Sequence, residues 1–414
     1  MDNAENKSGS LAPYTILDLC SDGGSLCSKW LADLGAEVIK IDAPHDDSKI
    51  AIDTSVHWRF MNMGKKSITL DLELKSDQEK FRLLARQVDA VIESHPTGWM
   101  DERGIGFDAL RKETPRLVFT SISPFGRTGP YAHHSGSDLV LSALSGMMYV
   151  TGDKDRAPVR VSVPQTYLHG AAEGSVSTTM ALYHAAKTGR GQHIDVSSQL
   201  ATIRALMNAT QFPPLEGRNM QRSGAFMEMG PIKWQMVFKA KDGHVCVMLA
   251  GGALGGTTIK GFLSWAADDI EVPKALTEID WKKIEIMTLL FDAEKRKLLD
   301  KVCEIFNQFF PLHTKEALYE RSLKERLMLA PVCTIEDIRS DEQLKARGYF
   351  SAIKEESGKT VHYPGDWAKL SKTPLNTGRR APLLGEHNDL FFKGSTRRSE
   401  EQRAETQQPV LVES

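Results

Sequence analysis

Short apolar runs alternate with helical patterns through about the first 200 residues, and this alternation constrains the fold more than any other feature. The apolar run TILDLC (15–20) precedes the turn-forming SDGGS and the helical pattern LCSKWLADLG, after which AEVIKID (36–42) is apolar again. Two strands that flank a helix pair in parallel, because the helix carries the chain back across the sheet. The chain is therefore predicted to open with a strand–helix–strand unit.

The alternation continues to about residue 197 and predicts a doubly wound parallel sheet, which is an α/β fold. A further helical pattern, SQLATIRALMNATQF, follows the last strand and is expected to break at Pro213 and Pro214. The other strand patterns are SITLDL, DAVIES, RLVFTSIS and GQHIDVS, and the helical patterns between them are DQEKFRLLARQV, FDALRKETP, SDLVLSALSGMM and residues 170–187.

From Trp234 onward the pattern changes. The stretch WQMVFKAKDGHVCVML predicts an antiparallel hairpin that turns at Lys241-Asp242-Gly243, and two long helical patterns follow it. Residues 225–330 are therefore predicted to form a smaller α+β domain. A chain of 414 residues is too long for one typical core, which also favours two domains. A second hairpin is expected at GYFSAIKEESGKTVHYPG, and the polar, charged end at 393–414 is predicted to be disordered.

Composition excludes several classes of function. A formal net charge of −2 gives no reason to expect nucleic acid or an anionic membrane as a partner. The N-terminus lacks an apolar signal core, and no apolar run reaches the roughly 18–20 residues that span a bilayer. Five scattered cysteines without a Cys-X-X-Cys pair indicate a reducing compartment, and the expected location is cytoplasmic. They are Cys20, Cys27, Cys246, Cys303 and Cys333.

Two glycine-rich segments invite a nucleotide-binding interpretation. SDGGS, with Asp42 ending the next strand, superficially resembles a dinucleotide-binding unit, but that motif needs GxGxxG and Asp22 would repel a phosphate. A tight turn is favoured there over NAD or FAD. The second segment, AGGALGGTT (250–258), lacks the Lys-Ser/Thr of a P-loop. It is expected to be a mobile lid, with a simple turn as an equal alternative. The lid glycines would be Gly251, Gly252, Gly255 and Gly256.

The remaining motifs do not predict a metal site or a hydrolase. The adjacent His133 and His134 cannot easily face one ion, and no third ligand lies at a regular spacing, so a solvated loop is favoured. The chain has no GxSxG and no catalytic cysteine motif, so hydrolase chemistry has no support. No metal ligand is predicted.

Several segments together resemble the family III CoA-transferases, a group that includes the α-methylacyl-CoA racemases. The similarity runs from about residue 12 to 390 in the family's order, and TGRGQ and FGRTGPYA are its most specific parts. The other segments are ILDL…LADLGAEVIKID, NMGKKSITLDL, ERGIGFDALRKETPRLVFTSIS, TGRGQHIDVS, APVCTIEDIRSDEQLKARGYF and APLLGEHN.

The resemblance implies a large domain built from both ends of the chain, a small domain from the middle, and two subunits interlocked like rings. It agrees with the change of pattern at Trp234. The expected organisation is a flexible N-terminus (1–11), a large α/β domain (12–224), a small α+β domain (225–330), a C-terminal part that returns to the large domain (331–392) and a disordered tail (393–414).

The stretch VPQTYLHG (163–170) lacks the reactive group that the resemblance implies. Family members attack the acyl-CoA thioester with an aspartate just before the helix that leads to TGRGQ, and that place falls at Thr166 or at its neighbours Gln165 and Tyr167. A threonine hydroxyl is almost never ionised without a base and cannot form an exchangeable mixed anhydride. The racemase reaction also requires a histidine where Ser137 stands, so α-proton exchange is not expected. No catalytic residue is predicted.

The resemblance also implies weakened contacts to CoA. The family's Glu-Asn-Phe segment is replaced by Glu93-Ser94-His95, a common lysine by Glu73, and an expected arginine by Glu102. Each change removes a group suited to an adenine or a phosphate. The residues left as CoA contacts are Lys75, Ser94, His95 and Arg103.

These expectations lead to a catalytically silent subunit of a hetero-oligomeric CoA-transferase. A homologous partner would supply the aspartate, and CoA would move from an acyl-CoA such as succinyl-CoA to a carboxylic acid such as benzylsuccinate, as in anaerobic toluene degradation. CoA thioester is the substrate, and no bound cofactor is expected. One alternative is a non-catalytic protein that binds CoA thioesters or has a regulatory role. Another is an active homodimer that uses Asp138 or Glu173, although structural roles are simpler for both.

Overall fold

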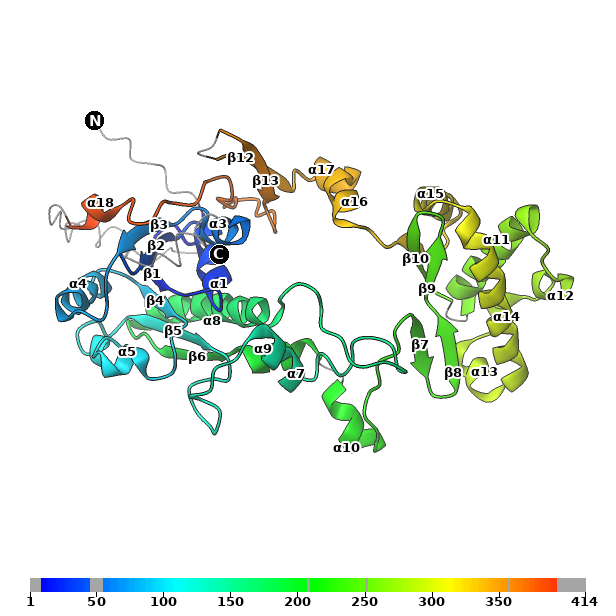
Figure 1. The fold of residues 1–414 in the computed structure, drawn as a ribbon, viewed down its shortest axis with the longest axis horizontal. Helices are drawn as coiled ribbons and strands as arrows, with labels where there is room; N and C mark the ends of the chain where they lie inside the picture. The colour runs from blue at the N-terminus through cyan, green and yellow to red at the C-terminus, as the bar shows by residue number, and fades with distance from the viewer. Residues whose placement is uncertain (1–8, 45–54, 207–208, 250–251, 356–357, 393–414) are drawn as a thin grey trace, which may run out of the picture. The chain divides into compact units, whose positions relative to one another are not determined.

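The computed structural model describes residues 9–44, 55–206, 209–249, 252–355 and 358–392, and the chain divides into two compact units (Figure 1). The first unit contains the described parts of 1–147, 160–211 and 342–414, and the second contains 148–159 and 212–341. The second unit contains more of the chain than the expected 225–330 block, since it also includes 148–159, 212–224 and 331–341. Within it, Arg222 donates hydrogen bonds to the carbonyl oxygens of Asp153 and Arg156.

The first unit is built on a six-stranded, fully parallel sheet with the order β3-β2-β1-β4-β5-β6. This order confirms the predicted doubly wound α/β sheet. Every strand lies at the place where the sequence pattern predicted one. The strands are β1 (Thr15–Leu19), β2 (Glu37–Asp42), β3 (Lys66–Thr69), β4 (Ala90–Glu93), β5 (Val118–Ser123) and β6 (His193–Ser197).

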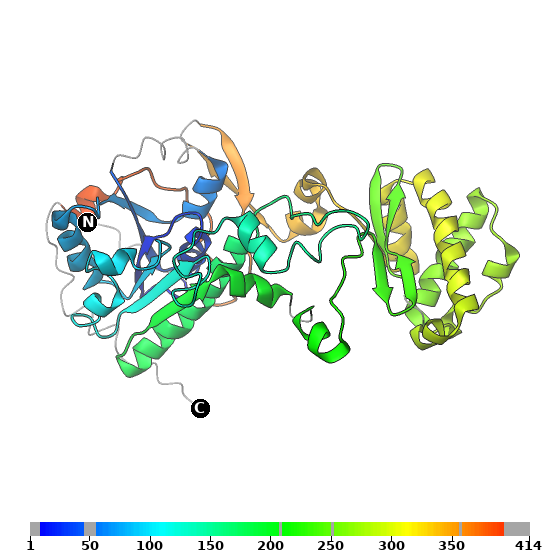
Figure 2. The same cartoon turned by 60° about the horizontal axis from the view of Figure 1, so that its bottom comes forward.

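Helices cover both faces of this sheet (Figure 1; Figure 2). Helices α1 (Ser25–Asp33) and α8 (Thr166–Thr188) share one apolar core with Ile16 of β1. The next residue, Leu17, belongs to the core on the opposite face, as expected for alternating strand side chains. That second core is closed by α4 (Lys75–Ala85), α5 (Trp99–Glu102) and α6 (Phe107–Leu110).

A buried ion pair fixes the end of β1. Asp18 and Lys65 are both fully buried, their Oδ2 and Nζ atoms lie 2.8 Å apart, and the Ser28 hydroxyl donates to the same carboxylate at 2.7 Å. Burial by itself raises the pKa of Asp18, but Lys65 and Lys40 outweigh burial and hold it below its usual value. The network therefore ties β1 to α1 and to the segment before β3.

The C-terminal part of the chain packs against the β3 edge of the first unit. Thr69 N–H donates to Asn388 Oδ1 at 2.9 Å, and Ser67 N–H donates to His387 Nδ1 at 3.2 Å. The expected hairpin at 348–365 is confirmed as the antiparallel pair of β12 (Phe350–Lys354) and β13 (Thr360–Pro364). The other elements of this unit are α3 (Val56–Asn62), α7 (Asp138–Leu144), α9 (Ser198–Ala205), η1 (Ala209–Gln211), α17 (Glu342–Ala346) and α18 (Asn388–Phe392).

The second unit packs helices against small antiparallel sheets. The predicted hairpin at Asp242-Gly243 is confirmed, since β9 (Val237–Ala240) pairs with β10 (Gly243–Val247), and β11 (Leu329–Pro331) completes the sheet. A separate hairpin joins β7 (Phe226–Met229) and β8 (Ile232–Gln235). The helices are α10 (Phe212–Glu216), α11 (Gly252–Asp269), α12 (Lys274–Thr277), η2 (Trp281–Lys283), α13 (Ile286–Phe291), α14 (Ala293–Phe309), η3 (Phe310–Leu312), α15 (Lys315–Glu325) and α16 (Ile335–Ser340).

Two expectations from the sequence are wrong. The proposed lid is the start of helix α11, which contains Gly252, Gly255 and Gly256, while Gly251 lies outside the described residues. A Cβ on Gly256 would lie 2.4 Å from the Trp281 carbonyl carbon, so close helix packing requires this glycine. The expected helix break at Pro213 and Pro214 is also misplaced. Helix α9 ends earlier, at Ala205, and both prolines lie in the first turn of α10. Proline is tolerated there because the backbone N–H groups of a first helical turn have no acceptor within the helix.

Candidate functional site

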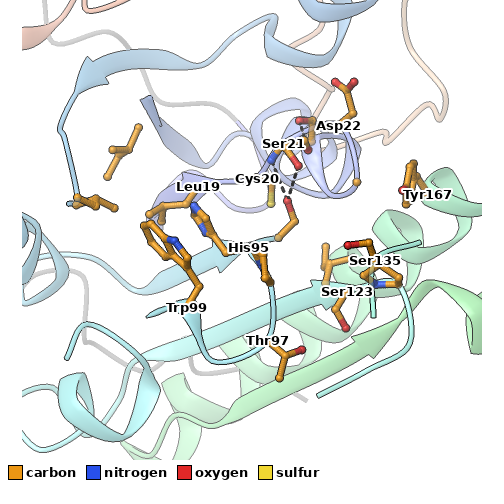
Figure 3. A pocket seen from close by; sticks show the side chains of 18 of the residues that line it. Leu19, Cys20, Ser21, Asp22, His95, Thr97, Trp99, Ser123, Ser135 and Tyr167 are labelled. Carbon is orange, nitrogen blue, oxygen red and sulfur yellow. Dashed lines mark hydrogen bonds between the residues drawn. The ribbon is translucent and has the colours of Figure 1, made fainter. Parts of the chain in front are cut away.

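The first unit contains a cavity of about 680 Å³ at the carboxyl ends of its parallel strands. Its lining includes residues that follow β1, β2, β3, β4 and β5, together with a loop around His133 (Figure 3). In open α/β sheets, ligands bind in the crevice outside the carboxyl ends of the strands. The position of this cavity is therefore that of a ligand site.

The turn after β1 forms one side of the cavity. It is the tight turn that the sequence predicted, and a Cβ on Gly24 would lie 2.6 Å from Cys20 Sγ, so the turn requires glycine there. Ser21 N–H donates to Ser94 Oγ at 2.8 Å, and the two hydroxyls lie 3.1 Å apart (Figure 3). Burial raises the pKa of the Cys20 thiol well above its usual value, so this cavity thiol stays protonated at neutral pH.

An aromatic stack forms the wall after β4. The rings of His95 and Trp99 lie 4.1 Å apart and almost parallel, and the Arg103 guanidinium carbon is 3.8 Å from the Trp99 centroid. Both His95 and Arg103 are therefore within stacking distance of Trp99. Arg103 Nη2 also donates to both oxygens of Glu73, at 2.6 and 2.7 Å. Glu73, which stands where the resemblance implies a lysine, is thus paired with Arg103.

The rest of the lining contains more carboxylates than cations. Lys40 is buried, and its Nζ donates to the Cys20 carbonyl at 2.7 Å and lies 3.2 Å from Asp42 Oδ1. The other oxygen of Asp42, Oδ2, is buried without a hydrogen-bond partner. A buried acceptor of this kind is costly unless a donor reaches it, so Asp42 favours a ligand that carries a hydroxyl or amine group. Asp22, Asp71 and Glu73 complete the acidic part of the lining.

Thr166, at the place where the resemblance implies a nucleophile, is fully buried at the start of α8. Asp138 Oδ1 accepts three hydrogen bonds there, from Gln165 N–H at 2.8 Å and from the N–H and hydroxyl of Thr166 at 2.9 Å each. Thr166 is absent from the cavity lining, whereas Tyr167 is part of it. Burial, followed by the neighbouring Asp138 and Asp22, raises the pKa of the Tyr167 hydroxyl, which donates to the Gly136 carbonyl.

Asp138 and Glu173, the two other carboxylates considered as nucleophiles, both have hydrogen-bond partners in the structure. Asp138 satisfies backbone donors at the start of α8, which is the work of a helix cap. Glu173 Oε2 accepts a hydrogen bond from Arg204 Nη1 at 3.0 Å in a partly exposed ion pair, away from the cavity lining. The Ser137 hydroxyl accepts from Val140 N–H at 3.4 Å and caps α7.

The structure separates the predicted CoA contacts. Ser94 and His95 line the cavity, whereas Arg103 contacts the Trp99 ring and is not part of the lining. Lys75 is exposed at the start of α4 and is not part of the lining. His133 lines the cavity next to His134, and the described part of the chain holds no group of three or more side chains suited to bind a metal. The sequence did not indicate that Trp99 and Asp42 line the cavity. Their positions in the wall arise only when the segments that follow different strands come together in the fold.

A cavity at the carboxyl ends of a doubly wound sheet, walled by turn residues and an aromatic stack, is the arrangement of an α/β protein with a ligand crevice at the edge of its sheet. The particular family follows from its sequence. The chain belongs to CoA-transferase family III, whose sequence model matches residues 11–388. This family transfers CoA between carboxylic acids and uses CoA thioesters as substrates.

Individual relatives are similar over almost their whole length. The chain is 30% identical over 386 residues to the succinyl-CoA:(R)-benzylsuccinate CoA-transferase subunit BbsE of Thauera aromatica, covering 90% of this chain and 91% of that protein. It is 28% identical to the succinate–glutarate CoA-transferase of Agrobacterium fabrum, with 94% and 96% covered.

Solved structures share the fold. A CAIB/BAIF family protein from Brucella suis superposes with a TM-score of 0.75 at 26% identity, covering 96% of this chain and 99% of that one. Rv3272 of Mycobacterium tuberculosis has a TM-score of 0.76 at 20% identity, with 93% of this chain and all of that chain covered. Within the described residues, none of the helices combines the length and the apolar character that a membrane crossing requires.

Proposed function

We propose that this chain is the catalytically silent subunit of a hetero-oligomeric family III CoA-transferase whose homologous partner supplies the nucleophilic aspartate. The observation that carries the proposal is the start of α8, where Thr166 is buried and its hydroxyl donates to Asp138 at 2.9 Å. A hydroxyl that donates to a carboxylate inside a helix cap is held as a structural group. The carboxylate that accepts from this hydroxyl also holds two backbone N–H groups, and Thr166 is not part of the cavity lining, so the hydroxyl is not placed to attack a thioester bound there.

Asp138 does not replace the missing nucleophile. Its Oδ1 accepts three hydrogen bonds, which spread the negative charge over the donors and lower the nucleophilicity of that oxygen. Movement of Asp138 towards a thioester would also leave two backbone N–H groups at the start of α8 without their acceptor. The acyl-enzyme chemistry is therefore assigned to the partner.

The proposed substrates follow from the relatives. The succinate–glutarate enzyme and the BbsE subunit both bear names that describe transfer between succinate and another dicarboxylic acid. We infer succinyl-CoA as the donor and a dicarboxylic acid as the acceptor, with benzylsuccinate as the leading candidate. The likeness to a named subunit also supports a two-subunit enzyme.

An exposed apolar surface on the first unit supports an interlocked partner. It lies on three helices, α7, α8 and α9, which pack against one another. On α8, Val176, Met180 and Tyr183 follow helical spacing along one face and are 54%, 61% and 67% exposed. Exposed apolar side chains on helices that pack together favour a protein interface. The surface consists of Leu139, Val140, Leu144, Val176, Met180, Tyr183 and Leu200.

The test compares the isolated chain with the chain co-expressed with a homologue that carries the aspartate. Both are incubated with succinyl-CoA and a set of dicarboxylic acids, and hydroxylamine traps any acyl-enzyme for mass spectrometry. We expect no transfer by the isolated chain and trapping only on the partner's aspartate in the complex. Turnover by the isolated chain near the enzyme median of about 10 s⁻¹ would exclude a silent subunit.

A further inference from the structure

Two buried charged side chains hold the backbone of Cys20, the first residue after β1. Cys20 N–H donates to Asp18 Oδ1 at 2.9 Å, and Lys40 Nζ donates to the Cys20 carbonyl oxygen at 2.7 Å. Burial alone lowers the pKa of Lys40, but the carboxylates of Asp42 and Asp18 outweigh burial and raise it, so Lys40 is a cation at neutral pH. Both polar atoms of the Cys20 backbone are therefore held by charge-assisted hydrogen bonds, which are about twice as strong as neutral ones.

The backbone that is held in this way leads directly into the cavity. Residues 20–23 line the cavity, and Ser21 is exposed there (Figure 3). Ser21 N–H donates to Ser94 Oγ at 2.8 Å, and the two hydroxyls lie 3.1 Å apart, so the turn after β1 is joined to the segment after β4. A rotation of the peptide groups on either side of Cys20 would move Ser21 away from Ser94. The orientation of the turn therefore depends on the two charged side chains.

Ionic partners fix these two side chains in turn. Asp18 Oδ2 lies 2.8 Å from Lys65 Nζ, and Lys40 Nζ lies 3.2 Å from Asp42 Oδ1. Replacement of a buried ion pair by apolar side chains of similar volume often costs no stability, because burial takes both charges out of water. Stability alone therefore gives little reason for two such pairs beside one turn. The pairs supply a donor and an acceptor that orient the turn, and apolar side chains have neither.

We propose that Asp18 and Lys40 are positioning residues for ligand binding, which act through the Cys20 backbone on the turn that forms one side of the cavity. The proposal rests on the proposed function, because it takes the cavity as the place where a CoA thioester binds. With the turn held, Ser21 and Ser94 present their hydroxyls as a preset pair, and a ligand binds without the entropic cost of ordering the turn. Loss of either hydrogen bond to Cys20 should weaken binding without unfolding the chain.

The first measurement follows the turn through the thiol of Cys20. Cys20 and Cys27 are both buried, but Cys20 lines the cavity, whereas Cys27 lies in α1 and does not. Opening of the turn exposes Cys20 alone, and global unfolding exposes both. The complex of this chain with its aspartate-bearing partner is treated with iodoacetamide, and mass spectrometry follows each cysteine. In Lys40→Met, we expect alkylation of Cys20 to become about tenfold faster and that of Cys27 to stay unchanged.

The loss of charge at Lys40 does not produce this result by itself. Burial and Asp18 raise the pKa of the Cys20 thiol, and Lys40 opposes them. Removal of the cation would therefore raise this pKa further and slow alkylation, which requires the thiolate. A second comparison keeps the charge constant, since Asp18→Asn/Lys65→Met and Asp18→Leu/Lys65→Met both lack the ion pair. Only the first retains an acceptor for Cys20 N–H, so we expect faster alkylation of Cys20 in the second alone.

The second measurement is the affinity of the same complexes for CoA, by titration calorimetry with the partner unchanged. Lys40→Met and Asp18→Leu/Lys65→Met should weaken CoA binding by about tenfold, and Asp18→Asn/Lys65→Met should restore most of it. The matched control is Lys29→Met/Asp33→Asn, which removes another buried ion pair, within α1, whose residues do not line the cavity. It should keep both the affinity for CoA and the slow alkylation of Cys20.

Unchanged alkylation of Cys20 in Lys40→Met, or equal acceleration at Cys20 and Cys27, would overturn the positioning role. An opened turn that binds CoA as tightly as the unsubstituted complex would do the same, and so would an equal loss of affinity in Lys29→Met/Asp33→Asn. Each of these results leaves the silent-subunit proposal standing, because that proposal is tested by turnover and by trapping of the acyl-enzyme. Conversely, turnover by the isolated chain would overturn the silent subunit without changing how Cys20 is held.

Discussion

The start of α8 and the wall after β4 both carry residues other than those the resemblance implies. The two regions differ in whether these residues are buried or line the cavity. At the start of α8, the Thr166 hydroxyl is buried and fully used in a cap with Asp138. In the wall, Ser94 and His95 remain at the surface of the cavity. The first region holds its hydroxyl in a buried hydrogen bond, whereas the second presents polar side chains to the cavity. The proposed function therefore predicts different effects of substitution in the two regions.

The largest expected effect is that of restoring a carboxylate at the start of α8. Thr166→Asp would bury a charge within reach of Asp138, and like charges at this distance in a buried site repel. We expect a loss of about 3–5 kcal/mol in the free energy of unfolding, measured by urea denaturation at neutral pH. The loss should shrink as the pH falls, because repulsion raises the pKa of one carboxyl in the folded state and its protonation relieves the charge.

Replacing Asp138 provides the matched control for that variant. Thr166→Asp/Asp138→Asn removes the repulsion and keeps an acceptor for the backbone N–H groups, so most of the lost stability should return. Activity of the isolated double variant should stay low, because catalysis needs the thioester within about 3–3.5 Å of the attacking oxygen and Thr166 does not line the cavity. Efficient acyl-enzyme trapping at position 166 would show instead that only the nucleophile had been lost.

The second effect concerns the cap itself. Asp138→Ala removes the acceptor of three hydrogen bonds at the start of α8, and loss of a helix cap costs about 1–2 kcal/mol. A corresponding fall in the melting temperature of the chain in its complex is the expected readout. If Asp138 were instead the nucleophile, Asp138→Asn would keep the stability and abolish turnover by the complex. We expect Asp138→Asn to retain turnover.

Much of the first unit could be predicted from the sequence because its strands are short, apolar and regularly spaced. The start of α8 could not be placed at Thr166, since the group that caps it, Asp138, is 28 residues earlier in the chain. The glycines of α11 were mistaken for a lid because their role, close packing of Gly256 against Trp281, is a tertiary contact.

The candidate site was predicted only in part, for a similar reason. Ser94 and His95 follow β4 directly, so the strand pattern brings them to the carboxyl edge of the sheet. Lys75 was expected there too, but helix α4 begins at this residue and leaves it exposed. The pairing of Glu73 with Arg103 joins residues that are 30 positions apart, and sequence spacing does not reveal it.

A third, smaller effect tests whether the acidic side chains of the lining weaken the binding of CoA. Glu73→Lys would replace an acidic group of the lining by a cation, at the cost of the pair with Arg103. Glu73 is 62% exposed, so the pair contributes at most about 1 kcal/mol to stability. We expect CoA to bind about threefold to tenfold more tightly in calorimetry, because a cation near phosphates forms charge-assisted contacts. Glu73→Gln, which removes charge without adding a cation, should give a smaller gain.

The smallest effect is expected at Glu173, the other carboxylate considered as an alternative nucleophile. Its carboxylate pairs with Arg204, whose side chain is 71% exposed, and such surface pairs contribute about 0.2–1 kcal/mol. Glu173→Ala should therefore lower the free energy of unfolding by about 0.5 kcal/mol and leave transfer by the complex unchanged. Arg204→Ala should match it, since both variants break the same pair. A loss of turnover in Glu173→Ala that Arg204→Ala does not reproduce would assign the carboxylate to the chemistry, and the contrast between a silent α8 and a ligand-binding wall would no longer hold.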